Sequence, residues 1–141
     1  MINFIIKPSV NRYVGKEVKQ YIDWINSTMS FPKNVTIDIT GSSYVYNSIT
    51  TEKVAGTFFG PYSNSTLVPY IKIATGDFFQ AVDKYGIDKA KLDLYNILSH
   101  EIVHFIQWLD DAPYDEAQAE SQAEKISDCY FIFLEKKSVI S

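Results

Sequence analysis

His100-Glu101-Ile102-Val103-His104 occupies the longest helical pattern in the chain, which runs from about Asp88 to Asp111. Apolar residues recur here at helical spacing and on other sides as well: Leu92, Tyr95, Ile97, Leu98, Ile102, Val103, Phe105, Ile106 and Leu109. A helix that is apolar on all sides is buried in the middle of its domain. We therefore predict a central buried helix, with Asp88 as its N-cap, that carries two histidines and a glutamate.

Two histidines four positions apart lie on one helix face, about 5–6 Å apart at Cβ, so both imidazoles can bind one metal ion. His100 and His104 are the only two histidines of the chain. Glu101 lies beside them and can reach a water on that ion without binding the ion itself. Zinc lowers the pKa of such a water from about 15.7 to about 7, so a carboxylate can take its proton at neutral pH. The motif predicts zinc ligation by the histidines and a general base at Glu101.

A second helix follows and supplies the remaining candidates. Pro113 ends the central helix, and Asp115 can cap a final helix with the apolar stripe Ala119, Ala123, Ile126, Tyr130 and Phe133. Because few residues join the two helices, we expect an antiparallel helical hairpin. Catalytic zinc usually takes three protein ligands, so with no further histidine the third must be a carboxylate. Glu116, Glu120 and Glu124 recur at i, i+4 and i+8, although a solvated acidic face is the alternative interpretation.

With these residues the chain resembles a minimal gluzincin, the branch of zincin metallopeptidases in which a downstream glutamate joins the two histidines. Glu120-Ser121-Gln122-Ala123-Glu124 and Glu124-Lys125-Ile126-Ser127-Asp128 both match the Glu-x-x-(small)-(acid or amide) segment of that family, and the second is similar to the thermolysin version. In size the chain resembles small phage-type members, including those like the ImmA peptidases. The resemblance implies a zinc metallopeptidase that hydrolyses peptide bonds.

Two ways of counting residues from His104 point to different glutamates as the third zinc ligand. Glu124 lies 124 − 104 = 20 positions after His104, the spacing of thermolysin-like chains. However, with the turn near 112–114, His104 lies about seven residues before it and Glu120 about seven after, whereas Glu124 would overshoot by roughly 5–6 Å. Glu116 faces inward but comes too soon after the turn. We therefore expect Glu120 as the third ligand and Glu124 as a carboxylate that orients a histidine.

The rest of the chain predicts strands and shorter helices at residues 2–7 (strand), 11–28 (helix), 35–40 (strand), 54–59 and 67–74 (a β-hairpin around the loop 60–65), and up to Gln80 (short helix). Pro69 cannot donate to a ladder, so we expect the strand 67–74 at a sheet edge. The family resemblance implies that a peptide substrate pairs with this edge strand. The predicted fold is one zincin-like α+β domain over residues 1–141, with an N-terminal helix and a small, mostly antiparallel sheet packed on the metal-binding hairpin.

Composition narrows the class of protein. The 141 residues are 46% apolar and 21% charged, which is typical of a globular domain. A net charge of −4 argues against nucleic acid as a partner. No segment approaches the roughly 20 apolar residues of a membrane span, and the N-terminus has no signal-peptide pattern, so we expect a cytoplasmic protein. Cys129 is the only cysteine, which excludes an internal disulfide, and we expect it to be buried.

Two other functions fit the same residues. The first is a metal-stabilised binding or regulatory domain of zincin fold without turnover, although such a domain has no need of Glu101. The second is a hydrolase of a non-peptide amide, which no feature of the sequence excludes. The residue that helps the metal to stabilise the oxyanion is not identifiable, because ten tyrosines offer too many candidates.

Overall fold

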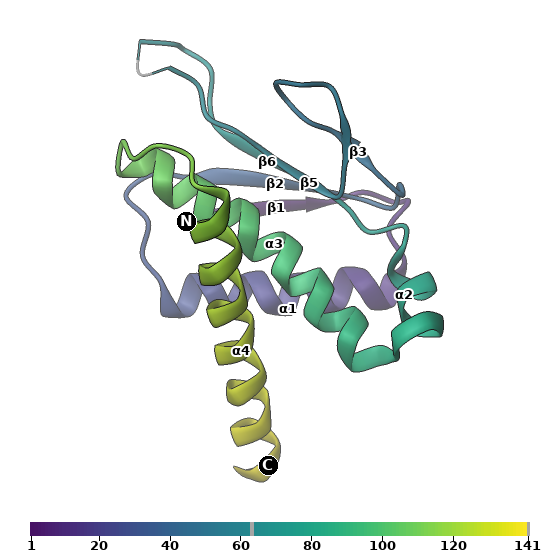
Figure 1. Ribbon diagram of the computed structural model, residues 1–141. Helices are drawn as coiled ribbons and strands as arrows, with labels where there is room; N and C mark the ends of the chain where they lie inside the picture. Colours follow the sequence, from purple (N-terminus) through teal and green to yellow (C-terminus); the bar gives the residue numbers. More distant parts are fainter. Residues whose placement is uncertain (63, 141) are drawn as a thin grey trace.

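The computed structural model describes residues 1–62 and 64–140. Within them the chain forms ten elements, listed here in chain order: β1 (Ile2–Ile6), α1 (Arg12–Thr28), β2 (Val35–Thr40), β3 (Val45–Tyr46), β4 (Lys53–Val54), β5 (Gly56–Phe59), β6 (Tyr70–Ala74), α2 (Phe78–Tyr85), α3 (Ile87–Leu109) and α4 (Glu116–Ile140). The predicted α+β class is confirmed, and the helices lie together on one side of the main sheet (Figure 1).

The main sheet has four strands in the order β1-β2-β6-β5, and β3 pairs with β4 in a separate small sheet. The predicted hairpin is confirmed as β5 and β6, which pair antiparallel, although Ser63 of its loop is outside the described residues. The prediction of a mostly antiparallel sheet is wrong. β1 pairs parallel with β2, and β2 pairs parallel with β6. The first pairing is parallel because α1 crosses from the end of β1 to the start of β2.

The prediction that strand 67–74 lies at the sheet edge is also wrong. β6 lies between β2 and β5, and Ile71 is in register with Ile37 on one side and Phe58 on the other. The strand begins at Tyr70, so Pro69 precedes the ladder and its missing N–H costs no hydrogen bond there. The edge strands of the main sheet are β1 and β5.

The core lies between the inner face of the sheet and the helices α1 and α3. In β2 the buried residues Val35, Ile37 and Ile39 alternate with Thr36, Asp38 and Thr40, as the period of two predicted. Burial of each such isoleucine stabilises the fold by roughly 1.5–3 kcal/mol. The predicted burial of the central helix is confirmed, since α3 buries residues on most of its sides.

Of the two predicted helix caps, Asp115 is confirmed and Asp88 is wrong, and Asn11 caps α1 in addition. Asn11 Oδ1 accepts a hydrogen bond from the Tyr13 amide at the start of α1, and Asp115 Oδ1 accepts one from the Gln118 amide at the start of α4. At α3, however, Gly86 holds the cap position and Asp88 lies in the first turn. Glycine serves here because its φ is +90°, which residues with a Cβ rarely adopt.

The final helix α4 packs against α3 with its first half and extends beyond the sheet with its second half (Figure 1). Its buried stripe consists of Ala119, Ala123, Ser127 and Tyr130. Cys129 is exposed, contrary to the prediction, because it lies off this stripe. Among the described residues, no helix is both long and apolar enough to cross a membrane.

Candidate metal centre

Helix α3 brings together the three residues that the motif predicted. One ligand atom each from His100, Glu101 and His104 lie within 4.8 Å of one another. Glu101 and His104 are buried, whereas His100 is half-buried, and His100 and Glu101 both line a cavity of about 490 Å³. Two imidazoles and a carboxylate at this spacing are a donor set that could hold a metal ion.

Glu116, the first residue of α4, bridges the two histidines. Its Oε2 lies 3.1 Å from His100 Nε2, and its Oε1 lies 2.7 Å from His104 Nε2. Three positions later Ala119 is fully buried, so Glu116 lies on the side of α4 that faces α3. The carboxylate therefore completes a set of two imidazoles and one carboxylate, the combination that binds catalytic zinc in several hydrolases.

His104 has an oxygen acceptor beside each of its two ring nitrogens. Its Nδ1 lies 2.9 Å from Gln107 Oε1, while its Nε2 faces Glu116 Oε1. A neutral imidazole has one N–H, so it cannot donate to acceptors at both nitrogens. A proton on Nδ1 would be donated to Gln107 Oε1 and would leave the Nε2 lone pair for a metal ion, which is the arrangement found around ligating histidines.

Gln107 also fixes the connection between the two helices. Its Nε2 donates to the Asp115 carbonyl at 3.1 Å and to Gln118 Oε1 at 2.8 Å, and its Oε1 accepts from the Asp115 amide at 3.3 Å. These partners determine which end of the amide faces His104. The loop 110–115 therefore folds back along α3, and α4 begins level with Gln107 instead of beyond the end of α3.

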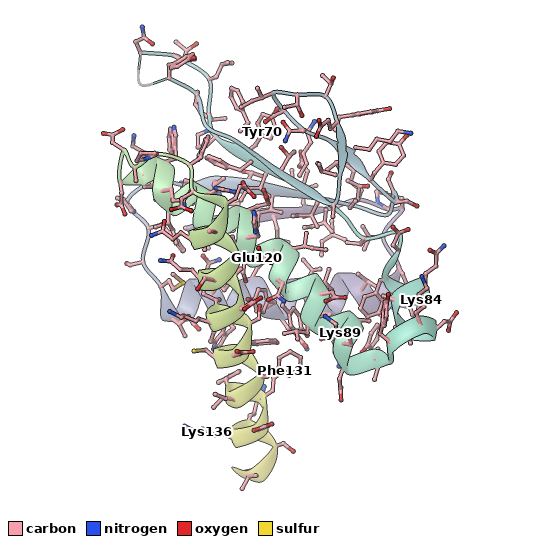
Figure 2. The ribbon with its side chains drawn as sticks, viewed as in Figure 1. Tyr70, Lys84, Lys89, Glu120, Phe131 and Lys136 are labelled. Atoms are coloured by element: carbon pink, nitrogen blue, oxygen red, sulfur yellow. The ribbon has the colours of Figure 1, made fainter. Side chains whose placement is uncertain are left out.

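This path explains why Glu116 reaches the histidines and the expected ligand Glu120 does not. Counting residues equally on both sides of the turn assumed that α4 starts past the end of α3, but Asp115 is already beside Gln107. Glu120 lies one turn further along α4, in front of α3 (Figure 2). Glu120 and Glu124 are exposed and line the 490 Å³ cavity, and neither makes a described contact with His100 or His104. The contacts thus favour Glu116 as the third ligand.

Glu101 is a buried carboxyl with no hydrogen-bond partner among the described residues. Burial, and next the negative charge of Glu116, raises its pKa to about 8. A divalent cation on the neighbouring imidazoles would favour the carboxylate and lower this pKa. Gly56 of β5 covers Glu101 closely, since a Cβ at this glycine would lie 3.1 Å from Glu101 Cγ. The edge strand therefore packs closely against the Glu101 side chain.

Sequence reasoning did not find Tyr114, which lies on the loop before α4. Its ring centroid is 5.3 Å from that of His104, and it lines a cavity of about 110 Å³ together with Glu101, His104 and Glu116. Burial raises the pKa of the Tyr114 phenol, and the charge of Glu101 adds to the rise, so the hydroxyl stays protonated at neutral pH. No motif marks this tyrosine, and only its position between the metal motif and Glu116 could have singled it out.

The described site is therefore built from one helix, one loop and the first residue of the next helix, beside an edge strand. Comparisons of the chain with protein-family models, with curated proteins and with solved structures found no match.

Proposed function

We propose that the chain is a zinc-dependent metallopeptidase with His100, His104 and Glu116 as metal ligands. The observation that supports this most is the bridging of both imidazoles by one carboxylate, while Gln107 holds the far nitrogen of His104. Two imidazoles with one carboxylate within hydrogen-bond distance of both form the donor set that zinc takes in several hydrolases. The motif resemblance to the gluzincins points to the same reaction.

Zinc bound by these residues would lower the pKa of a coordinated water to about 7 and polarise the carbonyl of the bond to be cleaved. Glu101 is the general base that takes a proton from the attacking water and then donates it to the leaving amine. Its position under Gly56, without a competing hydrogen bond, leaves both carboxyl oxygens free for this transfer. Tyr114 supplies a phenolic hydroxyl that can donate to the developing oxyanion.

The strand β5 is where a peptide would bind. It is an edge strand of the main sheet, and Gly56 places its start over Glu101. An extended peptide can pair with such an edge through main-chain hydrogen bonds. Ser48 Oγ donates to the Phe58 carbonyl at 3.2 Å, so a peptide that paired along the whole strand would replace this bond with its own. This assigns to β5 the role that the sequence had suggested for strand 67–74.

The deciding experiment measures zinc by elemental analysis and affinity titration in the parent chain and in matched alanine variants. We expect one zinc per parent chain, loss of binding in His100→Ala, His104→Ala and Glu116→Ala, and near-parental affinity in Glu120→Ala and Glu124→Ala. Loss of zinc binding in Glu120→Ala, with zinc binding retained in Glu116→Ala, would show that Glu120 is the third ligand, as expected from the sequence. A folded parent chain that takes up no zinc would contradict the proposed function.

Zinc-loaded protein is then tested on a peptide library and on small non-peptide amides. Cleavage of peptides that depends on Glu101 supports the peptidase. Zinc binding without turnover of any substrate would support the alternative of a metal-stabilised binding domain, and turnover of the small amides alone would support the alternative hydrolase.

A further inference from the structure

A second cavity, of about 540 Å³, lies at the end of α3 beside the start of the β5–β6 loop. We name it the aromatic pocket, and its lining includes Gly60, Pro61, Tyr62, Trp108, Pro113 and Tyr114. In Figure 1 the β5–β6 loop and the end of α3 lie on the same side of the molecule. The volume is within the range of about 300–1,000 Å³ that is typical of ligand-binding pockets.

The walls of the aromatic pocket are held in place without a ligand. Trp108 Nε1 donates to the Pro61 carbonyl at 3.0 Å, and the Trp108 ring stacks on Phe105 at 6.1 Å. At Gly60, a Cβ would lie 2.5 Å from Trp108 Cδ1 and 2.7 Å from the Tyr114 hydroxyl. The side chains of Trp108 and Tyr114 therefore both pack against Gly60. These contacts form the pocket before any ligand binds.

The charges of the lining favour an apolar occupant. Lys33 and Asp111 contribute one charge of each sign. Lys33 Nζ lies 5.1 Å from the centre of the Trp108 ring, where the cation is attracted to the ring face. The pocket therefore offers aromatic faces and proline rings without a net charge to recognise an acidic or basic group.

Tyr114 connects this pocket to the candidate metal centre. It lines the aromatic pocket and also the 110 Å³ cavity that contains Glu101 and His104. The pocket also continues the path of β5, because Thr57 and Phe58 line the smaller cavity and Gly60 and Pro61 line the larger one. A peptide that followed β5 across Glu101 would bring a neighbouring side chain to the pocket.

We propose that the aromatic pocket binds a large aromatic side chain of the substrate close to the bond that is cleaved. The inference rests on the proposed peptidase function and adds a substrate class to it. Burial of an aromatic side chain of 150–250 Å² against Trp108 and Tyr114 supplies binding free energy and fixes the register of the peptide.

The test uses Trp108 as a reporter in the Trp24→Phe variant, which leaves it as the only tryptophan of the chain. N-acetyl-phenylalaninamide and N-acetyl-alaninamide are titrated with chelator present, so that the result is independent of zinc. We expect a saturable fluorescence change with the phenylalanine probe only. Ala112→Phe, which fills the pocket from its lining, should weaken this binding at least tenfold, whereas Ala117→Phe on the exposed start of α4 should not.

If Trp24→Phe does not fold, calorimetry on Ala112→Phe and Ala117→Phe in the parent chain makes the same comparison. Equal binding of the two probes, or equal effects of the two substitutions, would overturn the proposal. With zinc-loaded protein, kcat/KM should favour peptides with phenylalanine beside the cleaved bond over alanine counterparts, and Ala112→Phe should remove the preference. Selective probe binding without cleavage of any peptide would contradict the peptidase function and leave the selectivity of the pocket standing.

Discussion

Helix α3 carries buried polar side chains on two sides, and the two sides differ in whether these side chains have hydrogen-bond partners. Toward α1, the Tyr95 hydroxyl donates to Glu17 Oε2 at 2.7 Å, and Ser99 forms a hydrogen bond with the Tyr21 hydroxyl. Toward β5 and α4, Glu101 has no hydrogen-bond partner among the described residues. A buried polar group with a hydrogen-bond partner adds about 1 kcal/mol of stability, whereas the Glu101 side chain lines two cavities instead.

We interpret the hydrogen-bonded polar groups near α1 as structural and Glu101 near β5 and α4, unpaired within the described part of the chain, as functional. Tyr21, Tyr95 and Tyr130 form a closed aromatic cluster, with Tyr21 and Tyr95 stacked at 4.6 Å. Around Glu101 and His104 the polar groups instead converge on two cavities. A buried carboxyl with a raised pKa beside a cavity is typical of functional sites, so we expect Glu101 to have a role in chemistry.

The largest effect is expected at Glu101. Glu101→Gln should lower the rate of peptide hydrolysis by about 10²–10⁴-fold, because general acid–base catalysis contributes that much. Zinc binding should persist and the free energy of unfolding should change little, because glutamine is close in size to glutamate and Glu101 makes no hydrogen bond among the described residues that the substitution would break. Steady-state kinetics, zinc analysis and urea unfolding check the three parts. Glu135→Gln, on the exposed half of α4, is the matched control, and hydrolysis at the parental rate in Glu101→Gln would refute the assigned role.

An intermediate effect, on zinc affinity, is expected at Gln107, which contacts His104 of the candidate metal centre. Gln107→Met should weaken zinc binding by about 10–100-fold, because His104 loses the acceptor that orients its ring. Gln118→Met removes one hydrogen bond of the same network but leaves the contact between Gln107 and His104, so its zinc affinity should stay within a few-fold of the parent. Competition titration with a metallochromic chelator measures both. Equal losses in the two variants would mean that the loop, and not the imidazole contact, controls the affinity.

The smallest effect is expected at Tyr21, on the side of α3 that faces α1. It concerns the free energy of unfolding at alkaline pH. Burial raises the pKa of Tyr21 to about 12, although hydrogen bonds to Ser99 and Ser127 oppose the rise. The unfolded chain loses this proton from about pH 10, so the contribution of Tyr21 to stability is complete below pH 10 and declines as the pH rises toward 12. By pH 10.5 the parent should lose less than about 1 kcal/mol through this residue.

Urea unfolding at pH 9 and pH 10.5 measures this loss. Tyr21→Phe should be less stable than the parent at pH 9, through the lost hydrogen bond, but should depend less on pH between the two values. Tyr85→Phe changes an exposed tyrosine and should keep the parental pH dependence. A parental pH dependence in Tyr21→Phe would show that the phenol is not the group responsible.

The sequence predicted the parts of the molecule that depend on local pattern. Alternation in 35–40 and helical spacing in 11–28 gave β2 and α1, and the motif gave the convergence of His100, Glu101 and His104, because residues four apart on one helix are neighbours whatever the rest of the fold does. The order of the strands in the sheet depends on pairing between residues far apart in the sequence, which local patterns do not reveal. Pro69 lacks a backbone N–H, so it excludes one hydrogen bond. It does not determine which strands pair around it.

The residue that contacts both histidines could not be predicted for the same physical reason: it is Glu116, whereas the sequence favoured Glu120 as the third ligand. The position of Glu116 depends on the path of the loop 110–115, which is set by three hydrogen bonds of Gln107 to residues after the turn. Residue counting along ideal helices contains no information on such side-chain contacts. Tyr114 was missed because its role arises from the same loop, whose fold brings its ring to His104.

The short connection between His104 and Glu116 has a consequence for the order of assembly during folding. The two residues are 116 − 104 = 12 positions apart, whereas the pairing of Thr36 with Tyr70 joins strands 70 − 36 = 34 positions apart. Closure of a loop of about ten residues takes roughly 10–100 ns, and its entropic cost is smaller than that of the longer loop. In a refolding chain the α3–α4 hairpin can therefore form transiently before β2 pairs with β6, and we expect such a chain to bind metal before that pairing.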